Sequence, residues 1–156
     1  MKTDAIEISE ASAREAFLGH LVDKATAARM KYGLYIDAEA IVKMLADSDV
    51  LRYPASLVFD AGPLQPHEFA CVQPLGFHAA DGYAICLHPA FRDQPEIWPL
   101  LISYHVPAIN YGQIVDTTAA EIYGSTLIGL DREAYYQALC ELADSIGCAP
   151  VHEAAG

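Results

Sequence analysis

The chain has 156 residues, of which 9 are Lys or Arg and 21 are Asp or Glu, so its formal net charge at pH 7 is −12. A surface with this charge repels phosphate backbones and anionic lipid headgroups, so we expect neither nucleic acid nor a membrane surface as a partner. Hydrophobic residues make up 53% of the chain and charged residues 19%, which indicates either a well-filled core or apolar surface covered by a partner subunit. Of the two we favour a homo-oligomer.

The length fits one domain spanning residues 1–156. The first residues lack the apolar stretch of a secretory signal, and no apolar run reaches the ~18 residues that a membrane span needs. We therefore expect a cytoplasmic protein. Because that compartment is reducing, the four cysteines, which form no C-x-x-C pair, are predicted to be free thiols.

The N-terminal part predicts two helices. Residues 12–15 have the pattern of a capping box, apolar residues then recur at helical spacing from Phe17, and Gly33 is a typical stop. Asp37 is the predicted N-cap of a second helix that ends near residues 47–49. We expect both helices to lie against the same face of a sheet.

The middle of the chain predicts a small antiparallel sheet of three or four strands. Its strands are the runs 57–59, 68–73 and 83–88, with residues 100–106 as a possible fourth. A hairpin that is symmetric about the link 76–82 places Cys71 opposite Cys86.

This register divides the side chains of the hairpin between two faces. The face expected to belong to the core carries Ala70, Val72, Tyr83, Ile85 and Leu87. The other face mixes polar and soft groups, namely Phe69, Cys71, Gln73, Ala84, Cys86 and His88. A slip of one residue would separate the two cysteines.

The region after the hairpin is ambiguous. Residues 100–106 fit a helix or a strand, and we favour a helix, which Pro107 should end before a loop at residues 110–112.

Two more helices complete the C-terminal part. One should begin with the capping box at residues 118–121 and stop at Gly129, and the last should run from Asp131 to Gly147, followed by a mobile tail at residues 148–156. The predicted fold is therefore α+β, with two N-terminal helices and a C-terminal helical group packed on a small sheet.

The hairpin carries a candidate metal site. Cys71, Cys86 and His88 would be three ligands, with His67 or His105 as the fourth. Thiolate and imidazole suit zinc in a tetrahedral set, which makes zinc a possible cofactor. The alternative is that both cysteines are small buried hydrophobic residues.

The same groups allow an enzymatic hypothesis. Cys71 or Cys86, activated by a histidine, could act as the nucleophile of a hydrolase or transferase. A cysteine that faces the core would instead have its thiolate suppressed by desolvation.

A third cluster predicts a small-molecule pocket. Polar groups interrupt an apolar, proline-rich segment, as expected of a ligand site with apolar walls and a few hydrogen-bonding groups. These residues are Ser103, Tyr104, His105, Asn110 and Tyr111.

The sequence lacks the motifs of several common nucleotide-binding and metal-binding sites. The sequence has no Gly-x-x-x-x-Gly-Lys loop, no Gly-x-Gly-x-x-Gly, no His-Glu-x-x-His and no EF-hand loop. Our main hypothesis is a small cytoplasmic metal- or ligand-binding protein, and the Cys/His enzyme is an alternative. A further alternative is a non-catalytic oligomeric interaction subunit in which Tyr135, Tyr136 or the helix at residues 119–129 forms the interface.

Overall fold

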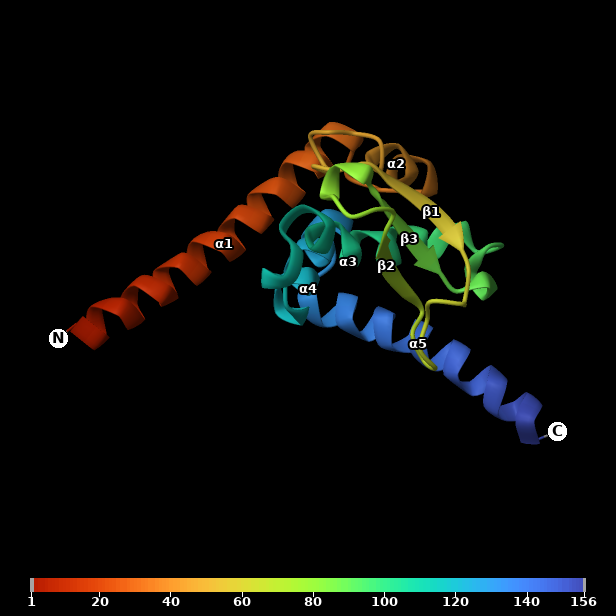
Figure 1. The fold of residues 1–156 in the computed structure, drawn as a ribbon. Helices are drawn as coiled ribbons and strands as arrows, with labels where there is room; N and C mark the ends of the chain where they lie inside the picture. Colours follow the sequence, from red (N-terminus) through yellow and green to blue (C-terminus); the bar gives the residue numbers. More distant parts are fainter. Residues whose placement is uncertain (1, 156) are drawn as a thin grey trace.

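The computed structural model describes residues 2–155, with side chains for residues 9–146. The described part has an α+β fold, as predicted (Figure 1). Its helices are α1 (Lys2–Tyr32), α2 (Ala38–Met44), α3 (Trp98–Tyr111), α4 (Thr117–Ile128) and α5 (Arg132–Ala155), and its strands are β1 (Ala55–Phe59), β2 (Ala70–Pro74) and β3 (Tyr83–Leu87). Short 3-10 turns are η1 (Ala79–Asp81), η2 (Pro89–Phe91), η3 (Pro95–Ile97) and η4 (Gly112–Ile114).

The sheet has the strand order β1-β3-β2, with β3 in the centre. β2 and β3 pair antiparallel with Cys71 opposite Cys86, which confirms the predicted register of the hairpin. β1 pairs parallel with β3, so the sheet is mixed and not wholly antiparallel as expected. The residues of a strand do not specify whether it pairs parallel or antiparallel with its neighbour. The link of residues 60–69 between β1 and β2 is long enough to leave room for β3 between these two strands.

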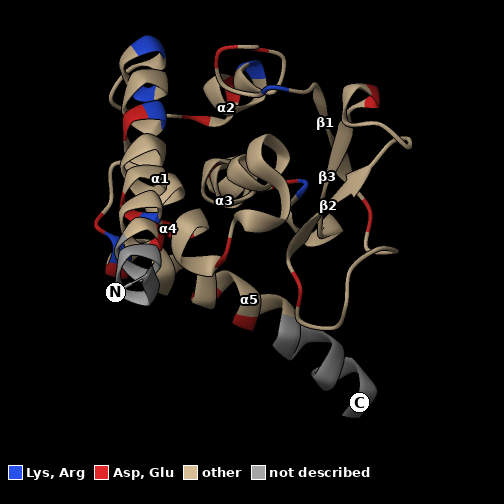
Figure 2. Ribbon diagram, turned by 60° about the vertical axis from the view of Figure 1, so that its left-hand side comes forward, with Lys and Arg blue, Asp and Glu red and all other residues tan. Residues whose placement is uncertain are grey.

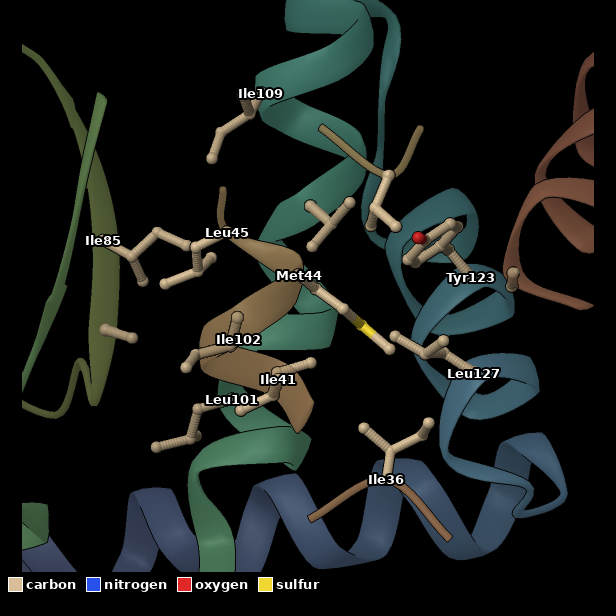
Figure 3. Packing of buried hydrophobic residues seen from close by; sticks show 14 of the residues in the cluster. Ile36, Ile41, Met44, Leu45, Ile85, Leu101, Ile102, Ile109, Tyr123 and Leu127 are labelled. Atoms are coloured by element: carbon tan, nitrogen blue, oxygen red, sulfur yellow. The ribbon is translucent and has the colours of Figure 1, made fainter. Parts of the chain in front are cut away.

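The core lies on one side of the sheet. In Figure 2, α3 lies between the sheet and a layer formed by α4 and α1. Ile85 faces Leu45, just after α2, and Met44 points towards Leu127 of α4 (Figure 3). All four are buried, and Ile85 belongs to the predicted core face of the hairpin. Ala84 and Cys86, which were predicted for the other face, are buried as well.

Helix α3 confirms the helical interpretation of residues 100–106, but it does not end where we expected. Pro107 lies inside the helix, and the predicted loop residues Asn110 and Tyr111 form its last turn. A proline inside a helix costs one hydrogen bond and about 3 kcal/mol. Burial of Val106 and Ile109 on either side of Pro107 offsets that cost.

Asp37 caps α2 as predicted, since its Oδ1 accepts a hydrogen bond from the Ala40 amide at 2.8 Å. α1 begins at Lys2 and passes through the predicted start at Ser12. It ends at Gly33 as predicted, where φ is +107° and the amide donates to the Arg29 carbonyl. α1 packs chiefly on α4 and not on the sheet, contrary to our expectation for both N-terminal helices.

The last helix also runs further than predicted. α5 continues past the predicted stop at Gly147 to Ala155. The predicted mobile tail, residues 148–156, lies outside the residues with described side chains. None of the described helices combines the length and the apolar character that crossing a bilayer requires.

Tyr135 joins the three C-terminal helices. Its fully buried hydroxyl, on α5, donates a hydrogen bond to the Leu100 carbonyl of α3 at 2.9 Å and lies 3.0 Å from Ser103 Oγ. Its ring lies against Gly124 of α4, where a Cβ would meet the ring and the hydroxyl. The absence of a side chain at Gly124 therefore sets how closely α4 and α5 approach.

We predict that Gly124→Ala destabilises the protein by about 1–3 kcal/mol, because the added methyl displaces the Tyr135 ring and strains its hydrogen bonds. The matched control is Gly19→Ala, since Gly19 is also helical but a Cβ there meets nothing within 4 Å. This control should be stabilised by up to ~1 kcal/mol through helix propensity. Urea unfolding of the two variants measures the difference, and an equal effect of both substitutions would contradict the role of Gly124.

Candidate functional site

A pocket of about 530 Å³ lies between the residues that lead into β2, helices α3 and α4, and the middle of α5. Its polar lining is His67, Glu68, Tyr104, His105, Thr117, Glu121, Tyr136 and Cys140, and its apolar lining is Phe69, Ala70, Leu139 and Ala143. Segments far apart in the sequence therefore share one cavity.

His105 is the most unusual group of this pocket. Its side chain is half-buried, and its Nε2 atom is buried without any hydrogen-bond partner. No other side-chain nitrogen or oxygen among the described residues is both buried and unpaired. Burial lowers the pKa of His105 from its ordinary 6.5 to about 4, so the imidazole is neutral at pH 7. A neutral ring offers one N–H donor and one acceptor, and the tautomer decides which of them Nε2 is.

The five residues of the predicted small-molecule pocket do not share one cavity. Tyr104 and His105 line the pocket, whereas Ser103 is fully buried against Tyr135. Successive residues of a helix point about 100° apart, so Ser103 and His105 cannot face the same side.

Asn110 and Tyr111 lie at the far end of α3 beside a different hollow of about 300 Å³. Asn110 Nδ2 donates to the Val50 carbonyl at 2.8 Å, and its Oδ1 accepts from the Arg52 amide at 2.7 Å. The Tyr111 hydroxyl lies 2.7 Å from His20 Nε2 on α1. Both side chains thus connect α3 to neighbouring segments.

The candidate metal ligands are split between the two sides of the sheet. Cys71 and Cys86 lie on the face opposite to α3, whereas His67 and His105 line the pocket. His88 Nδ1 accepts a hydrogen bond from the Ala90 amide at 3.1 Å. Within residues 9–146, no three His, Cys, Asp or Glu side chains come close enough to share a metal ion. The zinc hypothesis stays a prediction.

The cysteine nucleophile hypothesis gains no supporting geometry at Cys86. Burial, together with the neighbouring Cys71 thiol, raises the pKa of Cys86 and so lowers its thiolate fraction. The nearest histidine in sequence, His88, uses Nδ1 to cap the following turn.

The residues suggested for an oligomer interface are largely internal. Tyr135, Tyr123 and Leu127 are buried within the chain, and Tyr136 is 46% exposed at the rim of the pocket. Their helical spacing marked an apolar stripe correctly but could not tell a core contact from a subunit contact.

Sequence reasoning missed most of the pocket wall. Glu121, Tyr136 and Cys140 come from α4 and α5, and no local pattern connects them to His105. The structure also shows an unusual backbone conformation that the sequence did not predict: His67 has a φ angle of +77°. Residues other than glycine rarely adopt this conformation, and such positions cluster at binding sites.

No protein-family model matches the chain, and no curated protein or solved structure is significantly similar to it. The function is therefore inferred from the pocket itself.

We predict that His105→Leu changes the pH dependence of stability. Between pH 4 and 6.5 the folded chain binds fewer protons at His105 than the unfolded chain, so acidification favours unfolding. The stability that this histidine contributes is fully present above about pH 6.5 and is lost as the pH falls towards 4, up to about 3 kcal/mol in all.

His105→Leu has no imidazole to protonate, so it does not lose this stability as the pH falls. The substitution also removes the unpaired Nε2 atom. It should be at least as stable as the wild type at pH 7, and its advantage should grow as the pH falls. Urea unfolding of both proteins from pH 4 to 7 measures the difference. A difference that does not depend on pH would contradict burial of a neutral imidazole.

Proposed function

We propose that the chain is a small-ligand-binding protein, and that its ligand is a neutral or cationic organic molecule held in the pocket beside His105. The observation that carries the proposal is the buried Nε2 atom of His105, which has no hydrogen-bond partner among the side chains and backbone groups that the structure describes. Leaving a buried polar group unpaired costs about 1–3 kcal/mol. A ligand with one hydrogen-bonding group directed at this atom would recover that free energy.

The pocket walls suit a compact and partly aromatic ligand. Phe69, Leu139 and Ala143 are apolar, and Tyr104 and Tyr136 add aromatic rings. A volume of about 530 Å³ is within the usual range for small-molecule sites. Apolar contact would supply most of the affinity, and His105 would fix the orientation of the ligand.

The charges around the pocket disfavour anions. Glu68 and Glu121 both line it, and the whole chain carries a net charge of −12. Arg132 Nε lies 3.0 Å from Glu121 Oε1 and partly neutralises that carboxylate. Glu68 Oε1 accepts a hydrogen bond from the Gln65 amide, and none of the ion pairs among the described residues includes Glu68. A neutral or positively charged ligand is therefore favoured.

A reducing, cytoplasmic setting fits this proposal. Cys71, Cys86 and Cys140, the cysteines with described side chains, are free thiols. Cys140 lines the pocket, where oxidation would alter the wall.

Binding of three compounds with the same ring tests the proposal. Benzylamine, benzamide and benzoate carry a positive, a neutral and a negative group, and ligand-observed NMR measures their binding to the full chain. We expect binding of the amine and the amide, and weak or absent binding of the benzoate. His105→Leu should weaken the binding by roughly 5- to 150-fold, the cost of one buried hydrogen bond. His78→Gln alters an exposed histidine outside the pocket and should leave the binding unchanged.

Binding that is the same in wild type and His105→Leu would place the ligand elsewhere. Preference for benzoate would overturn the charge argument. No binding of any of the three compounds would contradict the proposed ligand class.

We also propose that a second copy of the chain is a partner. The support is the apolar fraction of 53% and the exposure of Met30, Leu34 and Tyr35, which are 78–80% exposed where α1 turns towards α2. Light scattering at high concentration should give more than the mass of one chain, and Leu34→Glu should reduce it to that mass. The control is Leu75→Glu, which adds the same charge at another exposed leucine. A single-chain mass for the wild type would contradict the proposal.

A further inference from the structure

We infer that Cys71 and Cys86 form a site of reversible oxidation, in which a hydroperoxide converts the two thiols into a cross-strand disulfide. This site lies on the face of the sheet opposite to α3 and is independent of the proposed ligand pocket. The juxtaposition that carries the inference is the direct pairing of two cysteines on neighbouring antiparallel strands.

The backbone geometry of the hairpin suits a disulfide. Cys71 and Cys86 are directly opposite each other, two positions from the pair Phe69 and His88, where the His88 amide donates to the Phe69 carbonyl at 2.8 Å. Hydrogen-bonded pairs recur every second residue, so the cysteines occupy such a pair, whose Cα atoms are typically ~5.5 Å apart. Disulfides span Cα separations of roughly 4.4–6.8 Å. The bond can therefore form without a change of register.

The two thiols differ in access. Cys71 is half-buried on the edge strand β2, whereas Cys86 is only 4% exposed on the central strand. Three side chains on the same face, Ser56, Val58 and Gln73, are exposed, so this face is open to solvent. An oxidant would thus meet Cys71 first.

The surroundings of each sulfur support the same order of reaction. Gln73 Nε2 donates a hydrogen bond to Cys71 Sγ at 3.7 Å. Burial is the largest cause of the raised pKa of Cys86, with further contributions from Cys71 and Asp60. Cys86 is the less reactive thiol until its neighbour is oxidised.

The reaction has two steps. The Cys71 thiolate attacks one oxygen of hydrogen peroxide, an S–O bond forms, the O–O bond breaks, and the departing hydroxide takes up the thiol proton to leave as water. Cys86 sulfur then attacks the Cys71 sulfur, an S–S bond forms, the S–O bond breaks, and the second hydroxide leaves as water with the Cys86 proton. The two thiols together lose two electrons, and the peroxide is reduced to two waters. An external dithiol reverses the change by attacking the accessible Cys71 sulfur.

The test is peroxide treatment of the reduced full-length chain, followed by digestion under non-reducing conditions and mass spectrometry. Chymotrypsin is used for the digestion because it can cleave after Phe77, between the two cysteines, whereas residues 53–91 contain no Lys or Arg for trypsin. We expect a peptide pair joined through Cys71 and Cys86 that is two hydrogens lighter than the separate peptides. The joined pair should disappear on addition of dithiothreitol. The cross-link closes a short loop, so the melting temperature of the oxidised protein should rise by roughly 5 °C and return on reduction.

Two variants serve as controls. Cys140→Ser removes a cysteine from the pocket on the other side of the sheet and should leave the cross-link unchanged. Cys71→Ser should leave Cys86 as a thiol after peroxide treatment, because its buried sulfur is then without an oxidised neighbour. Circular dichroism checks that each variant is folded.

Two outcomes would overturn the inference. One is oxidation of Cys71 to the sulfinic acid while Cys86 can still be alkylated after denaturation. The other is a cross-link that involves Cys140 or joins two chains in place of the Cys71–Cys86 pair. Both results are obtained on the wild-type chain, so they do not depend on the folding of any variant.

Discussion

The buried hydroxyl of Tyr135 is the interaction on which the arrangement of the C-terminal helices depends. An unpaired hydroxyl in the core is costly, so the hydrogen bond to the Leu100 carbonyl constrains the position of α5 along α3. Contact of the ring with Gly124 constrains the distance to α4. Tyr136, the next residue on α5, then faces the pocket together with Leu139 and Cys140 one turn further on. The Tyr135 contacts therefore help to position the α5 wall of the pocket.

Ser103 and His105 differ in whether their polar side-chain atoms have hydrogen-bond partners within the described part of the chain. Both lie on α3, two residues apart, and both have polar atoms inside the protein. The Ser103 hydroxyl has partners in Leu100 and Tyr135, whereas His105 Nε2 has none. The same helix thus provides hydrogen-bond partners for Ser103 and leaves His105, a residue that lines the pocket, with one buried atom unpaired among the described residues. A polar atom that the fold leaves unpaired is the more informative guide to binding.

Local patterns predicted the elements of this fold well but not their mutual placement. The Asp37 cap and the Cys71–Cys86 register follow from interactions within a few residues or across one hairpin. The parallel pairing of β1 and the continuation of α3 past Pro107 depend on distant residues that bury them, which no local pattern reports. The same limit applies to the site. His105 was identified, but its neighbours on α4 and α5 come from segments that only the tertiary fold brings together.

The position of β3 in the centre of the sheet determines the order in which the sheet can assemble. The β2–β3 hairpin joins strands that are adjacent in sequence, so its closure costs little chain entropy. β1 is made first during synthesis, but its parallel partner β3 is the last strand to leave the ribosome. The pairing of β1 with β3 spans more of the chain than the hairpin does, so closing it costs more chain entropy. Contacts of large sequence separation slow folding in general, and in this sheet the β1–β3 pair is the one that has this character.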